Sequence, residues 1–138
     1  MAKTVKELMS STPRTVSADQ TIVDAARAMR DENVGLVPVV DGERLTGIVT
    51  DRDIAMRVVA EGKDPESTKV TEIASTDLVT VDPQQDLDEA LRLMAQHQVR
   101  RLPVVEEDGR LVGIVAQADV AREGSDAQTG EVVQEISQ

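Results

Sequence analysis

The chain carries one pattern of apolar positions twice. In each of two stretches, four apolar residues recur at the three- and four-residue spacing of one helix face. They are Ile22, Ala25, Ala26 and Met29 in the first stretch and, 65 positions later, Leu87, Ala90, Leu91 and Met94. The pattern predicts two amphipathic helices, each with one buried stripe and a capping box at its start. The capping residues are expected to be Ser17 and Gln20 in the first copy and Asp82 and Gln85 in the second.

A longer apolar run follows each predicted helix. VGLVPVV at 34–40 and VRRLPVV at 99–105 are apolar enough to be strands buried on both faces. Pro38 and Pro103 favour edge positions for these strands. Shorter runs, RTVS, LVTV, LTGIV and LVGIV, predict further strands, and a second helix follows each hairpin. Each copy therefore reads strand, helix, strand, strand, helix.

The two copies are also similar in sequence, since GIVTDRDIA at 47–55 corresponds to GIVAQADVA at 113–121. A copy of about 60 residues buries only about 60% of its unfolded surface, so the copies are expected to share a core. We expect an α/β (α+β) fold in which two β-α-β-β-α repeats pack about a pseudo-twofold axis and create two related clefts. The predicted boundaries are 5–61 for repeat 1, 62–69 for a linker, 70–123 for repeat 2 and 124–138 for a polar C-terminal tail, where EVVQEI favours one short helical turn.

Composition narrows the range of functions. No Phe, Tyr or Trp is present to stack on a base, and a net charge of -11 disfavours nucleic-acid binding, so any anion must be held by local groups. The lack of cysteine excludes disulfides and thiolate metal sites. The sequence shows no signal h-region and no run of about 20 apolar residues. A cytoplasmic protein without membrane contact is therefore expected.

The stretch GIVTDRD is a candidate anion site. A strand is predicted to end at Val49 and a helix to begin near Asp51, which puts Thr50 at a helix amino terminus. The hydroxyl of Thr50 can donate to a phosphate, and Asp53 suits the cis-diol of a ribose. The alternative is a capping box that needs no ligand.

The second copy shifts this balance modestly toward a ligand. Asp119 remains although Ala116 has replaced the hydroxyl that a capping box would use. An acidic residue in a first helical turn is also stabilising by itself. Both interpretations of the stretch therefore stay open.

A second cationic feature lies in HQVRRLPVV. Arg100 and Arg101 interrupt an apolar run, where they need a paired carboxylate or an opening. An ion pair at the surface or between subunits is the alternative to a ligand site. His97, the only histidine, is expected to be an exposed helix cap. No catalytic group and no metal site is predicted.

Together these features resemble a tandem pair of CBS (cystathionine beta-synthase) domains, also called a Bateman module, from about residue 5 to 123. The resemblance rests on GIVTDRD with GIVAQAD and on VGLVPVV with VRRLPVV. It implies AMP, ADP, ATP or another adenosyl ligand in the cleft between the repeats, with phosphate and ribose touched by one repeat. The first site that it implies consists of Ile48, Thr50, Arg52, Asp53, Val79, Thr80, Arg100, Arg101 and Pro103.

A second, weaker site is implied in the opposite cleft, which lacks the hydroxyl and the arginine strand. We expect it to be empty or to accept only an uncharged adenosyl group. Its residues would be Arg14, Thr15, Gly35, Pro38, Ala116 and Asp119.

The sequence therefore predicts a non-catalytic regulatory module that binds an adenine nucleotide and needs no obligatory cofactor. A ligand-free dimeric interaction or scaffolding module is the alternative, and an enzyme is a distant third. The family implies homodimers, here through the helices that begin near Asp51 and Gln117. Apolar residues expected in that interface are Ile54, Val58 and Val120.

Overall fold

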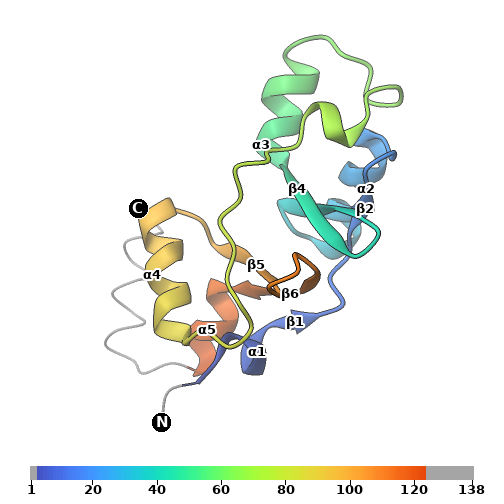
Figure 1. Cartoon of the computed structure of the whole chain (residues 1–138). Helices are drawn as coiled ribbons and strands as arrows, with labels where there is room; N and C mark the ends of the chain where they lie inside the picture. Colours follow the sequence, from blue (N-terminus) through green and yellow to red (C-terminus); the bar gives the residue numbers. More distant parts are fainter. Residues whose placement is uncertain (1–2, 124–138) are drawn as a thin grey trace. The chain divides into compact units, whose positions relative to one another are not determined.

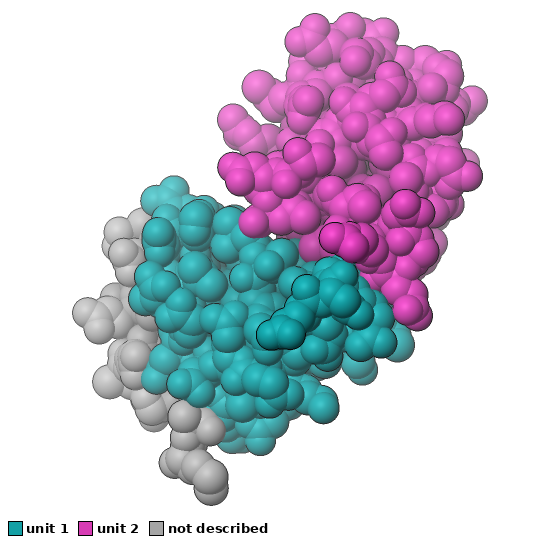
Figure 2. All heavy atoms as spheres, in the orientation of Figure 1, with its two compact units in different colours: residues 1–13, 79–138 teal, residues 14–78 magenta. Residues whose placement is uncertain are grey.

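The computed structural model describes residues 3–123 (Figure 1) and divides the chain into two compact units. Unit 1 comprises residues 1–13 and 79–138, and unit 2 comprises residues 14–78 (Figure 2). Each unit holds a three-stranded sheet together with helices, so the predicted α+β class is confirmed. The C-terminal tail, with its expected helical turn at EVVQEI, lies outside the described residues.

Unit 2 has the strand order β2-β3-β4, with β2 parallel and β4 antiparallel to the central β3. The Thr50 end of β4 runs directly into a helix whose second half is a π-helical turn. The elements are β2 (Val16–Ser17), α2 (Ile22–Glu32), β3 (Leu36–Asp41), β4 (Arg44–Thr50), α3 (Asp51–Ile54), the π-helical η1 (Ala55–Val59) and the 3-10 helix η2 (Val70–Glu72).

Unit 1 has the strand order β1-β6-β5, and both pairings are antiparallel. The expected strand at 78–81 is reduced to one isolated parallel bridge between Val81 and Val104. The elements are α1 (Val5–Leu8), β1 (Ser10–Ser11), α4 (Leu87–His97), β5 (Arg101–Val105), β6 (Leu111–Ala116) and α5 (Gln117–Glu123).

The first residues of each repeat pack on the other repeat. Backbone N–H of Val5 donates to the carbonyl of Gln85, and that of Val70 donates to the carbonyl of Gln20, both at 2.9 Å. These two bonds are equivalent under the 65-residue spacing, but each crosses from one repeat to the other. The 62–69 segment likewise folds against α2, because N–H of Ile22 donates to the carbonyl of the buried Thr68 at 2.9 Å.

This exchange explains why both copies of GIV begin with glycine. A Cβ on Gly113 would lie 2.6 Å from the sulfur of Met9 and 2.9 Å from the Ser10 carbonyl oxygen. A Cβ on Gly47 would lie 3.0 Å from that of Ala74. The exchanged segment therefore passes too close to each strand for a side chain at either glycine.

Each unit has its own apolar core, in which the predicted stripe packs against residues of the strands. In α4 all four stripe residues are buried, as expected. In α2 three are buried, but Ala26 is exposed, so this part of the prediction is wrong. In repeat 1 the buried Ala28 takes the place of Ala26 in the stripe.

Two details of the predicted elements are wrong. Pro38 lies in the central strand β3 and not at a sheet edge. The helices begin one turn later than expected, at Ile22 and Leu87, after the caps Thr21 and Asp86. The expected capping contacts form within the preceding turns instead, as in the 2.8 Å bond from N–H of Ser17 to Gln20 Oε1.

Candidate functional site

One face of each β-hairpin carries most of the predicted site residues. In unit 2, Leu36 lies opposite Thr50, and Pro38 lies opposite Ile48. Directly opposed residues of an antiparallel pair project from the same face of a sheet. The core of the unit is built on the other face, from residues such as Val37. On this second face Leu36, Ile48 and Thr50 are half-buried and Pro38 is buried.

The hairpin of unit 1 repeats this arrangement with different chemistry. Arg101 lies opposite Ala116, and Pro103 lies opposite Ile114. The positions that hold a leucine and a threonine in unit 2 therefore hold an arginine and an alanine here. Unit 1 thus lacks the hydroxyl of Thr50 at Ala116 of β6, and it has the cation Arg101 on the neighbouring strand β5.

Thr50 and Asp53 form the capping box that the sequence allowed. The Thr50 hydroxyl accepts a hydrogen bond from N–H of Asp53 at 3.1 Å, and Oδ2 of Asp53 accepts one from N–H of Thr50 at 3.0 Å. The capping box uses neither the hydroxyl proton of Thr50 nor Oδ1 of Asp53. Both side chains are half-buried, so the same pair can cap the helix and present a donor and an acceptor.

Arg52 is exposed beside this pair. Its backbone N–H donates to Oδ1 of Asp51 at 2.8 Å, and within residues 3–123 its guanidinium makes no ion pair. Asp51 in turn donates its N–H to the carbonyl of Gly35 at 2.9 Å, which ties the helix start to the beginning of β3.

Arg14, the phosphate partner expected in the weaker site, already faces a carboxylate. Its Nη1 lies 3.5 Å from Oδ2 of Asp31, and Arg30 contacts the same carboxylate at 3.0 Å. The hydrogen bond from Arg30 is the largest cause that lowers the pKa of Asp31. Desolvation opposes it, and the charges of Arg30 and Arg14 lower the pKa further. The charge of Arg14 is therefore partly balanced within unit 2, near the half-buried Thr15.

The arginines of unit 1 differ in exposure. Arg100 is exposed and precedes β5, whereas Arg101 is half-buried within the strand. Neither guanidinium makes an ion pair with another described residue, so the surface ion pair considered from the sequence is not formed inside residues 3–123. The half-buried Val79 packs on the core of unit 1, and Thr80 and Asp119 are also half-buried.

Both expected sites draw on residues of the two units. The first combines Ile48, Thr50, Arg52 and Asp53 of unit 2 with Val79, Thr80, Arg100, Arg101 and Pro103 of unit 1; the second combines Arg14, Thr15, Gly35 and Pro38 with Ala116 and Asp119. Their pairing across the units stays a prediction. Sequence reasoning missed Gln117, whose side chain is buried at the start of α5 and whose Nε2 has no hydrogen-bond partner among residues 3–123.

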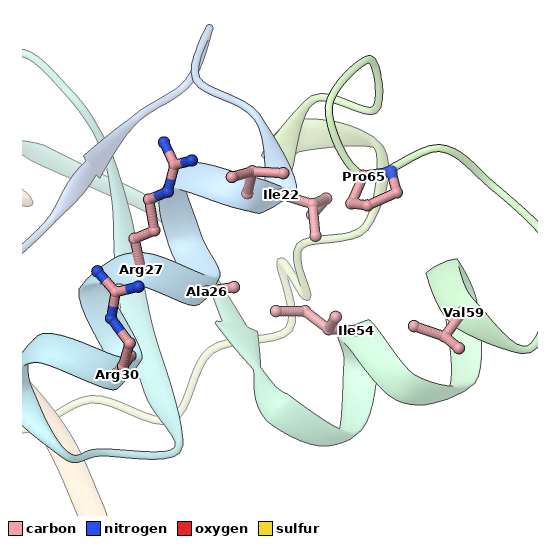
Figure 3. A pocket seen from close by; sticks show the side chains of 8 residues that line it. Ile22, Ala26, Arg27, Arg30, Ile54, Val59 and Pro65 are labelled. Atoms are coloured by element: carbon pink, nitrogen blue, oxygen red, sulfur yellow. The ribbon is translucent and has the colours of Figure 1, made fainter.

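An apolar groove of about 320 Å³ lies within unit 2, where Ile54 of α3 faces Ala26 of α2 (Figure 3). Val59, which lines the groove, is 69% exposed, and Met56 in the same π-helical turn is 54% exposed. Val58 and Val120, expected in a dimer interface, are instead fully buried in the cores of their own units. The groove is lined by Ile22, Val23, Ala26, Arg27, Arg30, Ile54, Val59 and Pro65.

Two further searches concern the described residues only. Between residues 3 and 123 no three His, Cys, Asp or Glu side chains are grouped so that they could hold a metal ion. No helix in that range combines the length and the apolar character that a membrane crossing requires.

Comparison with known proteins gives the same family for both repeats. The model of the CBS domain matches residues 5–60 and 70–126. The CBS domain-containing protein YhcV of Bacillus subtilis is 47% identical over 134 residues, which are 96% of this chain and 94% of that protein. Hypoxic response protein 1 of Mycobacterium tuberculosis is 40% identical over 120 residues, 86% of this chain and 83% of its own.

Solved structures agree in fold. A crystal structure of Hypoxic Response Protein I with two coordinated zinc ions has a TM-score of 0.81 at 39% identity, covering 89% of this chain and 100% of its own. The CBS domain pair of MJ0100, in complex with 5′-methylthioadenosine and S-adenosyl-L-methionine, has a TM-score of 0.78 at 29% identity, covering 89% and 96%. CBSX2 in complex with AMP has a TM-score of 0.74 at 26% identity, covering 87% and 94%.

Proposed function

Because this chain belongs to the CBS-domain family and carries the domain as a tandem pair, we propose that it is a non-catalytic regulatory module that binds an adenine nucleotide. Two structural neighbours support an adenosyl ligand, since one is a complex with AMP and the other with 5′-methylthioadenosine and S-adenosyl-L-methionine. The ligand is AMP, ADP or ATP, and the protein acts in the cytoplasm. Binding changes the population of a conformation that a protein partner recognises.

The observation that carries this proposal is the pair of side chains at the end of β4. Thr50 and Asp53 keep a free donor and a free acceptor while capping α3, which matches a phosphate oxygen and a ribose hydroxyl. Arg52 adds a cation beside them. In a chain of net charge -11, a phosphate needs such local compensation.

In this proposal the phosphorylated nucleotide contacts both repeats. Ile48, Thr50, Arg52 and Asp53 act on one side, and residues of unit 1 act on the other: Val79, Thr80, Arg100, Arg101 and Pro103. The weaker site, with Ala116 and Asp119, takes at most an uncharged adenosyl group, because the charge of Arg14 is already shared with Asp31.

We also propose that the module is a homodimer. The apolar groove of unit 2 and the exposed Met56 and Val59 supply apolar surface that a second copy can cover. A ligand-free dimer is the rival function that this surface favours. Light scattering at micromolar concentration tests the dimer, and a monomer mass contradicts it.

Titration calorimetry combined with thermal unfolding separates nucleotide binding from helix capping. Thr50→Ala removes a helix cap, which should lower the stability of the fold by about 0.5–2 kcal/mol. The accompanying loss of AMP binding free energy should be much larger than this loss of stability. Thr21→Ala is the matched control, because Thr21 is the N-cap of α2 in the same unit and its hydroxyl donates to Oδ2 of Asp24 at 3.3 Å, a contact that alanine removes. The control should lose stability and keep AMP affinity.

Two results would contradict the proposal. One is a wild-type chain that binds no adenine nucleotide, which supports the ligand-free dimer. The other is equal behaviour of Thr50→Ala and Thr21→Ala, which makes Thr50 a cap alone. The ultraviolet absorbance of a purified sample is a first test. A chain without Trp or Tyr has almost no absorbance of its own near 280 nm, so the absorbance of a retained purine can be seen directly.

A further inference from the structure

The groove of unit 2 combines exposed apolar side chains with cations. Ile54 of α3 and Val59 of η1 lie on one side of it, and Arg27 and Arg30 lie along α2 on the other (Figure 3). Val59 is 69% exposed, and Met56 in the same π-helical turn is 54% exposed. An exposed apolar patch with a charged rim is typical of a surface that binds another segment of protein.

The charge on this rim is opposite to that of the whole chain, which has a net charge of -11. Arg30 contacts the carboxylate of Asp31 at 3.0 Å, whereas the guanidinium of Arg27 makes no ion pair within residues 3–123. Charges across an interface are usually complementary, so a cation beside an apolar groove favours an occupant that is both apolar and acidic.

The sequence beyond the described residues contains a segment of this kind. In EVVQEI at 131–136, the apolar residues Val132, Val133 and Ile136 have the three- and four-residue spacing of one helix face. Glu131 and Glu135 stand next to them, and the sequence from 124 to 138 contains no lysine or arginine. Apolar grooves between helices typically bind a segment with apolar residues at this spacing.

We propose that residues 131–136 of a second copy of this chain bind in the groove of unit 2. Their apolar side chains contact Ile54 and Val59, and their carboxylates face Arg27. This inference rests on the proposed homodimer and names the segment that completes its interface. A stable interface buries about 1,200–2,000 Å². A groove of about 320 Å³ holds only a few side chains, so the dimer needs further surface. In a twofold dimer the exchanged segments supply it twice.

Analytical ultracentrifugation of the full chain over a concentration series measures the dimer dissociation constant. Val132→Ser/Ile136→Ser should raise this constant about 100-fold, since each dimer loses apolar burial worth about tenfold at two equivalent contacts. Ala127→Ser is the control, because it lies in the same part of the sequence but outside the apolar spacing of 131–136. It should leave the dissociation constant unchanged.

Charge reversal tests the contact of Arg27. Arg27→Glu should raise the dissociation constant about fivefold, and so should Glu131→Arg/Glu135→Arg. Combining the two sets of changes restores opposite charges, so the dissociation constant should return toward the wild-type value. Arg44→Glu is the matched control, because Arg44 is an exposed arginine of the same unit that does not line the groove.

The outcomes separate this inference from the proposed function. An unchanged dissociation constant in Val132→Ser/Ile136→Ser, or charge variants that do not rescue each other, would overturn the inference while the homodimer stands. A wild-type monomer would overturn both. If amides of α2 in that monomer then exchange faster in Val132→Ser/Ile136→Ser, the segment binds the groove of its own chain. A wild type that dimerises through the segment but binds no AMP contradicts nucleotide binding and leaves this inference intact.

Discussion

A substitution near the amino terminus should destabilise the unit that contains the carboxy-terminal repeat. Val5 is the first residue of repeat 1, but it is fully buried in the core of unit 1, together with Leu87 and Leu102. Val5→Ala removes two buried carbon atoms, worth about 0.8 kcal/mol each. With the cavity left behind, the loss is about 2–3 kcal/mol.

Hydrogen exchange followed by mass spectrometry locates this loss. Amides of α4, β5 and β6 should exchange about 30- to 150-fold faster in Val5→Ala, whereas those of α2 and β3 should change little. Val70→Ala is the matched control, since Val70 is equally buried in the core of unit 2, and it should show the opposite pattern. Faster exchange in α2 and β3 after Val5→Ala would refute the exchanged arrangement of the two segments.

Further predictions follow from single contacts. Gly113→Ala should release β1 from β6, seen as faster exchange at Ser10 and Ser11, because the new Cβ would lie 2.9 Å from a backbone oxygen that cannot move aside; unchanged exchange would contradict this. The hydrogen bond from Arg92 lowers the pKa of Glu89 from its ordinary 4.5, so this pair stabilises the fold above that pH and its contribution is lost as the pH falls. Melting temperatures of Arg92→Ala and wild type should therefore differ at pH 7 and converge toward pH 3, and a constant difference would exclude the pair as its source.

The elements of the fold were predictable because their signals are local. Spacing and composition alone are enough to predict the helical stripes of α2 and α4 and the apolar runs of β3 and β5. The exchange of segments was not predictable. A spacing of 65 residues is the same whether Val5 packs beside its own repeat or beside the other one, so the repeat carries no information on which pairing forms.

The wrong position of Pro38 and the overlooked Gln117 each have their own physical cause. Pro38 was expected at an edge because proline lacks an N–H, but the central position of β3 tolerates it because the parallel neighbour β2 is only two residues long. Its equivalent, Pro103, contributes a carbonyl and not an N–H to the bond from Val81. Gln117 was overlooked because no pattern of letters reveals that an amide is buried without a partner.

The differences between the two repeats separate folding from function. Gly47 and Gly113 are identical because the exchanged segments leave no room for a Cβ at either place. No such steric demand governs the opposed pairs at the hairpin ends, Leu36 with Thr50 and Arg101 with Ala116, and these are the positions that differ.

Repeat 2 differs from repeat 1 in charge at this end of the hairpin. It has Arg100 and Arg101 where repeat 1 has Gly35 and Leu36, and Gln117 where repeat 1 has Asp51, but it has Ala118 in place of Arg52. In the proposed function, Arg52 of one repeat and the two arginines of the other act on the same phosphorylated ligand, so these differences place the cations in the first site and leave the second site without them.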